Sequence, residues 1–332
     1  MPITQKEIAQ KLGVSQRLVS YALAGEAGVS DAMRQRILLA AKDLGYAPNR
    51  MARALVTGRT QQIALWFQFS TTINHEMSHQ FQKLAQSTSY DLLSISNKGQ
   101  IHNPSTVAVD GGIFYGSISP NFITPFPVVE MLVDLRGKHA GEPPRNDLIL
   151  MPIEEASRAA MQHLMEQGCR RIAFASIPIM MMAYEPRYRA YSAMMRKAGL
   201  PIEKIAVESP ADGNHRNSAQ RALQKYFQEN GFPDALFCSN DDIAIGAYRV
   251  LRQMNRRIPE ETAVLGCDDI QESKDHVPAL TSIQFPCEDI CRCAWEMLTT
   301  RIENPALPQR IKTFKARLVV RDSTIHRAAS RN

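Results

Sequence analysis

The sequence predicts a small all-α helix-turn-helix headpiece followed by an α/β core of two parallel-sheet lobes. In the first sixty residues, apolar residues recur at helical spacing and a capping residue precedes each stretch. From Gln61 onward, short apolar runs alternate with helical patterns, which is typical of parallel sheets covered on both faces. The length of 332 residues allows two or three domains with ample core.

Three helices are expected in the headpiece. The first covers residues 4–12, because Thr4 and Glu7 have the spacing of a capping box. Ser15 can cap a second helix, and Ser30 can cap a third that runs to residue 44 and stops at a glycine. Such a short three-helix unit buries one apolar face from each helix.

The second helix of the headpiece offers polar side chains at its start. A helix with this surface can enter the major groove of DNA and hydrogen-bond base edges, as the recognition helix of a helix-turn-helix does. The residues expected to face outward are Ser15, Gln16, Arg17, Ser20 and Tyr21.

The charge of the chain supports contact with nucleic acid. Residues 1–60 carry nine Lys and Arg against four Asp and Glu, which is +5 of the formal +6. The positive charge is therefore concentrated where phosphates would be met. The alternative is a small solvated helical domain with a basic bias, but spacing, caps and charge together favour DNA binding.

Residues 46–60 predict a short hinge helix. Tyr46 is followed by Ala47 and Pro48, and Asn49 can cap about two helical turns. Such a helix is marginal alone in water, so packing on a symmetry mate and on DNA would order it. Leu55 would then be a wedge inserted in the minor groove. Without the headpiece, an ordinary linker would be the preferred interpretation of this segment.

On these residues and motifs, the chain resembles the LacI/GalR family of bacterial transcriptional regulators over residues 3–322. The resemblance implies a homodimer that binds a near-palindromic operator, and a small effector that alters DNA affinity. The anchors are Ile8-Ala9, Gly13-Val14-Ser15, Val19-Ser20, Leu44-Gly45-Tyr46, Pro48-Asn49, Ala52, Leu55, Arg170-Arg171-Ile172-Ala173-Phe174, Asn240-Asp241 and Asp268-Asp269. We expect DNA contacts from Thr4, Ser15, Gln16, Arg17, Ser20, Tyr21, Ser30, Tyr46, Asn49, Ala52, Arg53 and Leu55.

The core is expected to form two lobes of the periplasmic-binding-protein-like kind that the resemblance implies. Candidate strands are 62–69, 91–96, 111–115, 127–133, 147–151, 171–176, 204–208, 235–238, 263–267 and 281–284. Candidate helices are 75–88, 154–167, 187–198, 216–230, 242–254 and 287–302. The expected domains are 1–46 for the headpiece, 47–60 for the hinge helix and linker, 61–167 with 286–314 for the first lobe, 168–285 with 315–325 for the second, and 326–332 for a tail.

The first lobe is expected to be trimmed of helices. Residues 97–110 have the length of a crossover but contain Gly99 and Pro104 and no helical stripe. Residues 116–126 contain two prolines and little periodicity, whereas family members typically have a helix in each gap. We predict loops, or at most a single turn, in both. The trimmed face would need another cover, such as a dimer partner, or the loss has no functional meaning.

An effector site is expected where polar side chains follow strands at the cleft. Arg187 stands where the family carries an effector-binding arginine, and Asn240 and Asp268 each follow a strand. A guanidinium, an amide and a carboxylate suit vicinal hydroxyls, as on a sugar, or the edge of a base. The adjacent Asp241 is expected to cap the next helix, and Asp268 or Asp269 could instead hold a turn. The full expected set is Gln68, His75, Arg187, Asn240, Asp268 and Phe285.

Several residues depart from the family pattern. Pro152-Ile153 replaces an Asp-Asn pair, Ala190 a glycine, Cys267 an aromatic residue and Phe285 a glutamine. These changes make the expected pocket more apolar and put a plain hexose in doubt. Tyr21 replaces a common arginine, which would read guanine bidentately, so the preferred half-site should differ from that of arginine-bearing relatives.

Metal and catalytic motifs are weak. His75-Glu76-Met77-Ser78-His79 matches HExxH, but no further ligand motif follows, so His75 is better interpreted as an effector contact or a surface histidine. Cys287 and Cys291 share a helix face while Cys293 points away, which favours packing around Trp295. With no nucleophile elbow and no phosphate- or dinucleotide-binding loop, we expect no enzyme, no metal and no cofactor.

Composition completes the prediction. Hydrophobic content of 44% and charged content of 22% are ordinary, and no apolar run is of membrane-spanning length. The polar start lacks a secretory signal, so we expect a cytoplasmic protein with six reduced cysteines and no membrane partner. The expected function is a ligand-responsive DNA-binding transcriptional repressor. The alternatives are a metal-dependent or other ligand-processing enzyme with an accessory DNA-binding head, and a transport-type binding protein.

Overall fold

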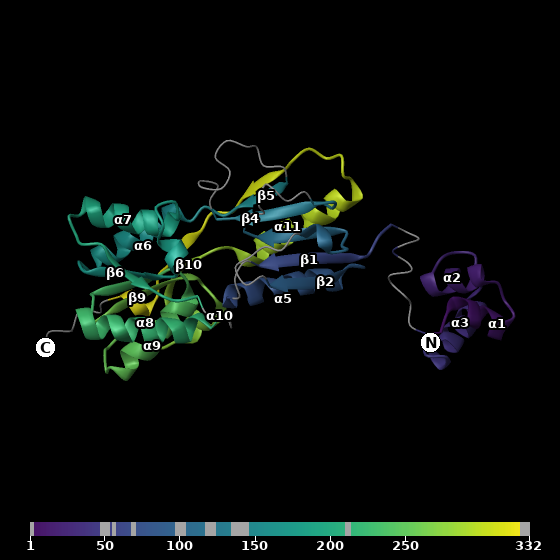
Figure 1. Cartoon of the computed structure of the whole chain (residues 1–332), viewed down its shortest axis with the longest axis horizontal. Helices are drawn as coiled ribbons and strands as arrows, with labels where there is room; N and C mark the ends of the chain where they lie inside the picture. The colour runs from purple at the N-terminus through teal and green to yellow at the C-terminus, as the bar shows by residue number, and fades with distance from the viewer. Residues whose placement is uncertain are drawn as a thin grey trace. The chain divides into compact units, whose positions relative to one another are not determined.

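Figure 1 shows the computed structural model of the chain. The structure describes residues 3–46, 54, 58–67, 71–96, 104–116, 124–133, 146–209 and 214–325. It divides into two compact units, Met1–Thr60 and Gln61–Asn332. Among the described residues, no helix is both long and apolar enough to cross a membrane.

The headpiece contains helices α1 (Gln5–Leu12), α2 (Gln16–Ala24) and α3 (Asp31–Asp43). Its core consists of small aliphatic side chains, among which Ile8, Val19 and Ile37 are fully buried. All three predicted N-caps are confirmed. Thr4 forms the capping box with Glu7, and Ser15 and Ser30 each accept a hydrogen bond from the backbone N–H three residues later.

The first lobe of the core contains a six-stranded parallel sheet in the order β11-β5-β4-β3-β1-β2. One face is covered by helices α5 (Thr72–Gln86) and α11 (Cys287–Glu303), which pack on the sheet in one apolar cluster. The strands are β1 (Gln62–Phe67), β2 (Asp91–Ser96), β3 (Gly111–Tyr115), β4 (Val128–Leu132), β5 (Asp147–Leu150) and β11 (Ile311–Thr313).

The other face of this sheet carries aromatic side chains. Trp66 stacks on Phe114 with ring centroids 4.3 Å apart, and Phe126 stacks on Trp66 at 6.1 Å. In the described part of the gap between β2 and β3, the chain forms a single 3-10 turn, η1 (Pro104–Thr106). The described part of the first gap thus agrees with the predicted trimming. Residues 97–103 and 117–123 lie outside the described residues.

The second lobe contains a six-stranded sheet in the order β12-β10-β9-β8-β6-β7, in which only β12 runs antiparallel. Helices α6 (Glu154–Glu166) and α7 (Pro186–Lys197) cover one face, and α8 (His215–Asn230) and α9 (Asp241–Gln253) cover the other. The short helix α10 (Gln271–Asp275) follows β9, and η2 (Pro178–Met181) and η3 (Asp322–Thr324) are 3-10 turns. The strands are β6 (Ile172–Ser176), β7 (Glu203–Ala206), β8 (Ala235–Cys238), β9 (Ala263–Asp268), β10 (Thr281–Gln284) and β12 (Arg317–Val319).

One expected boundary differs from the structure. The sequence assigns residues 61–167 to the first lobe, but α6 packs on the second sheet through Ala160, Met161 and Leu164. The chain therefore passes from the first lobe to the second between β5 and α6. It crosses again between β10 and α11 and between β11 and β12, so three segments join the lobes.

Candidate nucleic-acid interface and ligand cleft

Helix α2 presents the polar surface that the sequence predicts. Ser15, Gln16 and Arg17 are exposed, and Ser20 and Tyr21 are half-buried. The helix is held from below by Val19 and Ala22, which are buried against α1 and α3. The packing thus fixes which face of α2 meets solvent.

Arg17 and Tyr21 lie one helical turn apart and interact directly. The Arg17 guanidinium donates to the Tyr21 hydroxyl from Nε at 3.1 Å and from Nη2 at 2.8 Å. Its central carbon lies 5.1 Å from the centroid of the Tyr21 ring. The hydrogen bond to Tyr21 raises the pKa of Arg17, which stays a cation. Sequence reasoning placed both residues on the surface but did not predict that they pair.

Arg34 closes the carboxyl end of α2. It lies on α3 and donates to the carbonyl oxygens of Ala22 at 3.0 Å and Glu26 at 2.5 Å. A cation at this end of a helix also stabilises the helix dipole. Part of the basic character of the headpiece therefore maintains the helix that carries Arg17.

The other predicted DNA contacts fall into two groups. Thr4 and Ser30 use their hydroxyls as helix caps, and Tyr46 is partly buried against the headpiece core. The positions predicted for the hinge helix, Asn49, Ala52, Arg53 and Leu55, lie outside the described residues. All of these DNA contacts stay predictions.

In the core, Arg187 is at the first turn of α7, beside the carboxyl ends of β6 and β8. Its side chain is buried, and Nε donates to Glu185 Oε1 at 2.7 Å. Nη1 donates to the Ser239 carbonyl at 3.1 Å, and Nη2 lies 3.8 Å from the sulfur of Met180. Glu185 is itself fixed, because its other oxygen caps α7 at Tyr188 N–H. The guanidinium is thus held rigidly.

Asp268 ends β9 next to this arginine. The Cys267 thiol lies between them, 3.9 Å from Arg187 Nη1 and 3.7 Å from Asp268 Oδ1. Asp268 has a φ of 115°, in the left-handed region that non-glycine residues rarely adopt. Burial and the neighbouring Asp241 raise the pKa of Asp268 well above its usual range. Strain at a perturbed carboxyl group is typical of functional positions.

Tyr115, at the end of β3 in the first lobe, is influenced by the charges of this site. Burial and the charge of Asp268 raise its pKa, while Arg187 acts in the opposite direction. Its ring also lies 6.4 Å from that of Phe67 at the end of β1. Tyr115 was not predicted, because the sequence alone does not show that the charges of Asp268 and Arg187 act on the end of β3.

Asn240, and not Asp241, has the role of helix cap. The helix cap of α9 is Asn240, whose Oδ1 accepts from Ile243 N–H at 2.9 Å, so the prediction that Asp241 caps this helix is wrong. The amide nitrogen of Asn240 is the group that could still meet a ligand. The ligand contact of Asn240 therefore stays a prediction, and it now concerns only the amide nitrogen of the side chain.

Asp241 instead joins loops beneath the site. Its fully buried carboxylate accepts from Ser273 Oγ at 2.6 Å, Ser282 Oγ at 2.7 Å and Ile270 N–H at 3.0 Å. Burial raises its pKa to about 7. A Cβ at Gly266 would stand 2.1 Å from Oδ1, so the carboxylate needs a glycine there.

Asp269 holds the turn after β9, as one of the two alternatives expects. Its carboxylate pairs with Arg321 at 2.5 Å and accepts from Gln284 Nε2 at 2.7 Å. Asp268 is therefore the member of the pair that stands beside Arg187. Of the remaining predicted site residues, Phe285 packs between the lobes against both apolar clusters, His75 is exposed on α5, and Gln68 lies outside the described residues.

The HExxH motif has another use in the structure. Glu76 Oε1 accepts from Gln271 N–H of α10 at 2.9 Å, which joins the two lobes. Within the described part of the chain, no three His, Cys, Asp or Glu side chains are grouped so that they could hold a metal ion. Cys291 is buried with Trp295 in the cluster under α11, as the packing interpretation predicts.

A second set of contacts also crosses from α5 to the second lobe. Asp242, at the start of α9, accepts from Thr72 N–H at 2.9 Å and from Thr72 Oγ1 at 2.7 Å. Arg216 of α8 pairs with Asp242 at 2.8 Å and with Glu272 at 2.7 Å. Burial would raise the pKa of Asp242, but the bonds from Thr72 and Arg216 outweigh it and lower the pKa. We call Thr72, Glu76, Arg216, Asp242 and Gln271 the inter-lobe clamp.

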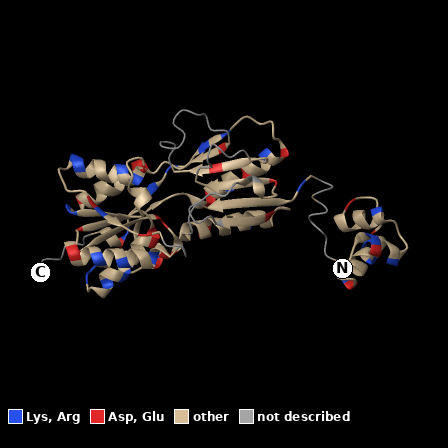
Figure 2. Ribbon diagram, in the orientation of Figure 1, with Lys and Arg blue, Asp and Glu red and all other residues tan. Residues whose placement is uncertain are grey.

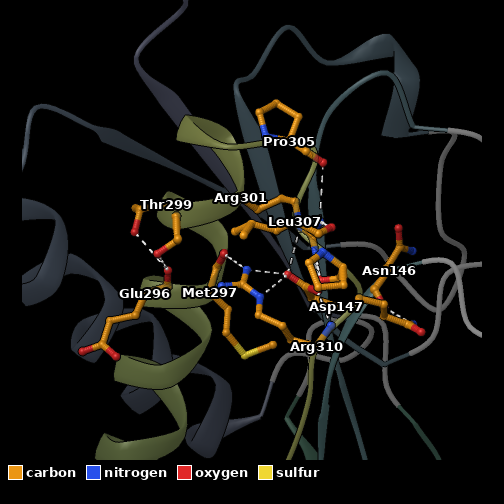
Figure 3. A network of polar contacts seen from close by, with 12 residues as sticks. Asn146, Asp147, Glu296, Met297, Thr299, Arg301, Pro305, Leu307 and Arg310 are labelled. Atoms are coloured by element: carbon orange, nitrogen blue, oxygen red, sulfur yellow. Dashed lines mark hydrogen bonds and ion pairs between the residues drawn. The ribbon is translucent and has the colours of Figure 1, made fainter.

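Lys, Arg, Asp and Glu occur in both lobes of the core (Figure 2), and one buried cluster of charges lies in the first lobe. The carboxylate of Asp147 is fully buried and pairs with Arg301 and Arg310, each at 2.6 Å (Figure 3). Burial would raise its pKa, but the two guanidinium groups lower it. A pocket of about 390 Å³ opens beside this network, at the amino ends of β4 and β5. Because the network ties α11 and β11 to β5, we assign it a structural role.

Comparisons with known proteins agree with this arrangement. A family model described as "Bacterial regulatory proteins, lacI family" matches residues 4–49, and one described as "Periplasmic binding protein-like domain" matches residues 161–324. The HTH-type transcriptional repressor PurR of Vibrio vulnificus is 27% identical, over 96% of this chain and 98% of its own. The ribose operon repressor of Escherichia coli is 28% identical, over 92% and 95%.

Solved structures show the same fold. A LacI-family transcriptional regulator from Silicibacter pomeroyi has a TM-score of 0.81 at 23% identity, with 98% of this chain and 100% of that chain covered. The lac repressor dimer bound to operator and an anti-inducer has a TM-score of 0.77 at 20% identity, with the same coverage. The predicted fold class, a helix-turn-helix headpiece with two parallel-sheet lobes, is confirmed.

Proposed function

Because the chain belongs to the lacI family of bacterial regulatory proteins, we propose that it represses transcription as a homodimer on a near-palindromic operator, under control of a small effector bound between the lobes. The family makes it a DNA-binding transcriptional regulator, and its relatives are repressors rather than enzymes. One observation carries the proposal: a capped, packed α2 with an exposed polar face is joined in one chain to a two-lobed core.

Two copies of the headpiece are needed for tight and selective binding. A single helix-turn-helix covers one half-site, and dimers place two recognition helices one turn of DNA apart. A solved relative in fold is described as a dimer bound to operator. In this chain, Arg17 and Gln16 would read base edges, while the basic residues around them would contact phosphates.

The effector would bind where Arg187, Asp268 and Tyr115 come together. A fixed guanidinium, a carboxyl group and a phenol offer donors and acceptors to a sugar or a related polar metabolite. A relative is named a ribose operon repressor. The apolar neighbours Phe285 and Cys267 favour a ligand with some apolar surface over a plain hexose.

The effector would act by changing the arrangement of the lobes. A ligand shifts such an equilibrium only by its difference in affinity for the two arrangements. The inter-lobe clamp supports this mechanism, because its contacts join one lobe to the other and must break if the lobes separate. A change of lobe angle would then order or melt the paired hinge segments at residues 48–56.

Selection of bound duplexes from a random library, with the purified full-length protein, tests the proposal. We expect enrichment of a two-fold symmetric site whose half-sites lie about one helical turn apart, and a dimer in solution by light scattering. The affinity should fall steeply as salt rises, because phosphate contacts release counterions. A protein that remains monomeric and enriches no sequence over the starting library contradicts the proposal.

A further inference from the structure

Tyr21 is placed to control how Arg17 meets DNA. Both side chains leave the same face of α2, one turn apart, where residues at i and i+4 are neighbours. Two hydrogen bonds, at 3.1 Å from Nε and 2.8 Å from Nη2, join the guanidinium to a single phenolic oxygen. A pair of bonds fixes the orientation of the planar group as well as its position.

The N–H donors of Arg17 that bind Tyr21 determine which donors remain for DNA. A guanidinium has five N–H donors in a rigid plane. The bonds to Tyr21 use the edge formed by Nε and Nη2. The edge left over consists of one N–H of Nη2 and an N–H of Nη1. Two parallel donors at this edge match the O6 and N7 acceptors of guanine in the major groove.

Tyr21 is itself restricted by the same bonds. A hydroxyl has two acceptor lone pairs and one donor hydrogen, and Arg17 takes both lone pairs. The phenol can therefore offer DNA only a donor, which suits a phosphate oxygen or a base acceptor. The backbone of this turn is held as well, because Arg34 donates to the carbonyl oxygens of Tyr21 at 3.4 Å and Ala22 at 3.0 Å.

We propose that Tyr21 is a positioning residue for sequence recognition: its hydroxyl orients Arg17 so that the outer edge of the guanidinium reads one guanine in each half-site. This inference rests on the proposed DNA-binding function and deepens it. The aromatic residue at position 21 thus acts on base selection through its neighbour. The two side chains act together in base recognition, so a substitution at either position changes the preference for guanine.

The unit can be tested with random duplexes, so the operator sequence need not be known. Duplexes bound by the full-length wild type, Arg17→Ala, Tyr21→Phe and the double variant are selected from one random library. We expect the wild type to prefer guanine at one position per half-site and Arg17→Ala to lose that preference. Tyr21→Phe should weaken the same preference about 2- to 10-fold, the range for one lost hydrogen bond, and leave the other positions unchanged. The double variant should match Arg17→Ala, because Tyr21 acts through Arg17.

Controls separate positioning from a structural role. Affinity for random duplex and its salt dependence should stay constant in Tyr21→Phe, because no charge changes. Tyr184→Phe, the same change at an exposed tyrosine of the core, should leave the base profile as in the wild type. The inference is overturned if Tyr21→Phe keeps the wild-type profile, changes a different position, or weakens binding to all sequences alike. A wild type with no base preference at all would instead refute the proposed function.

Discussion

At the scale of single residues, the most informative group in the core is the buried carboxyl of Asp241. Its folded pKa of about 7 lies above the ordinary value of 3.8, so the folded state binds a proton more tightly than the unfolded state does. Stability from this group is therefore largest at low pH and falls as pH rises from about 4 to about 7. The three donors around it, Ser273, Ser282 and Ile270 N–H, offset burial only in part.

The direction of this pKa shift gives a prediction for Asp241→Asn, which replaces the titrating carboxyl group with an amide of similar shape. Between pH 5 and pH 8, the free energy of unfolding of the wild type should fall relative to that of the variant by about 2–3 kcal/mol, the amount that a shift of this size implies. Denaturant unfolding of both proteins at several pH values measures the difference, and comparison with the variant cancels all other titrating groups. Parallel pH curves would show that Asp241 is ionised in the folded protein throughout.

How far the site could be predicted depends on whether each role is local. The headpiece caps follow from local patterns and are confirmed. Local patterns also singled out Arg17 and Arg187, which the structure places on the exposed face of α2 and at the first turn of α7, but their roles toward DNA and effector stay predictions. The cap of α9 was assigned to Asp241 instead of Asn240 because a cap and a buried acceptor look alike in sequence when two polar residues precede a helix. Tyr115 and Asp242 act across the gap between the lobes, and no local spacing records such pairs.

At the scale of elements, the strength of the periodic pattern separates what was predictable from what was not. Long helices and buried strands appear within a few residues of their predicted bounds, since their apolar periodicity is strong. The short strands β11 and β12 and helix α10 were missed, because they have three to five residues each and bury too few of them to show a periodic apolar pattern. Helix α6 was found but given to the wrong lobe, since periodicity does not say on which sheet a helix packs.

The element prediction concerns the carboxyl end of α2. Arg34→Ala removes the donors that bind the carbonyl oxygens of Ala22 and Glu26, and should lower the stability of the headpiece by about 1–2 kcal/mol. Amide hydrogen exchange of the full chain should then be faster in α2, with α5 to α9 unchanged. Arg36→Ala removes the same charge from an exposed site on α3, and should change stability by about 0.5 kcal/mol or less. If the two substitutions lowered stability equally, α2 would be stabilised by positive charge in general and not by the hydrogen bonds from Arg34.

At the scale of the whole core, two features set the relation between the lobes. Three chain segments and the packing of Phe285 against both apolar clusters allow the lobes to move while remaining joined. The clamp opposes that motion on one side. In it, the Asp242 carboxylate lies at the amino ends of both α5 and α9, where two helix dipoles favour a negative charge. Its lowered pKa keeps this charge in place at neutral and mildly acidic pH.

Removal of that charge should loosen the lobes without unfolding either one. In Asp242→Ala, Thr72 N–H loses its acceptor, and Arg216 keeps only Glu272 and the Thr72 hydroxyl as partners. The amides of Thr72 and Gln271 should then exchange about 5- to 150-fold faster, for a loss of about 1–3 kcal/mol. The buried strands β1 and β8 should keep their protection. Asp289→Asn, which breaks an exposed ion pair with Arg292 on α11, is the matched control and should change neither amide. If exchange at Gln271 stays unchanged while that at Thr72 rises, the two contacts open separately, and Asp242 caps α5 without holding the lobes together.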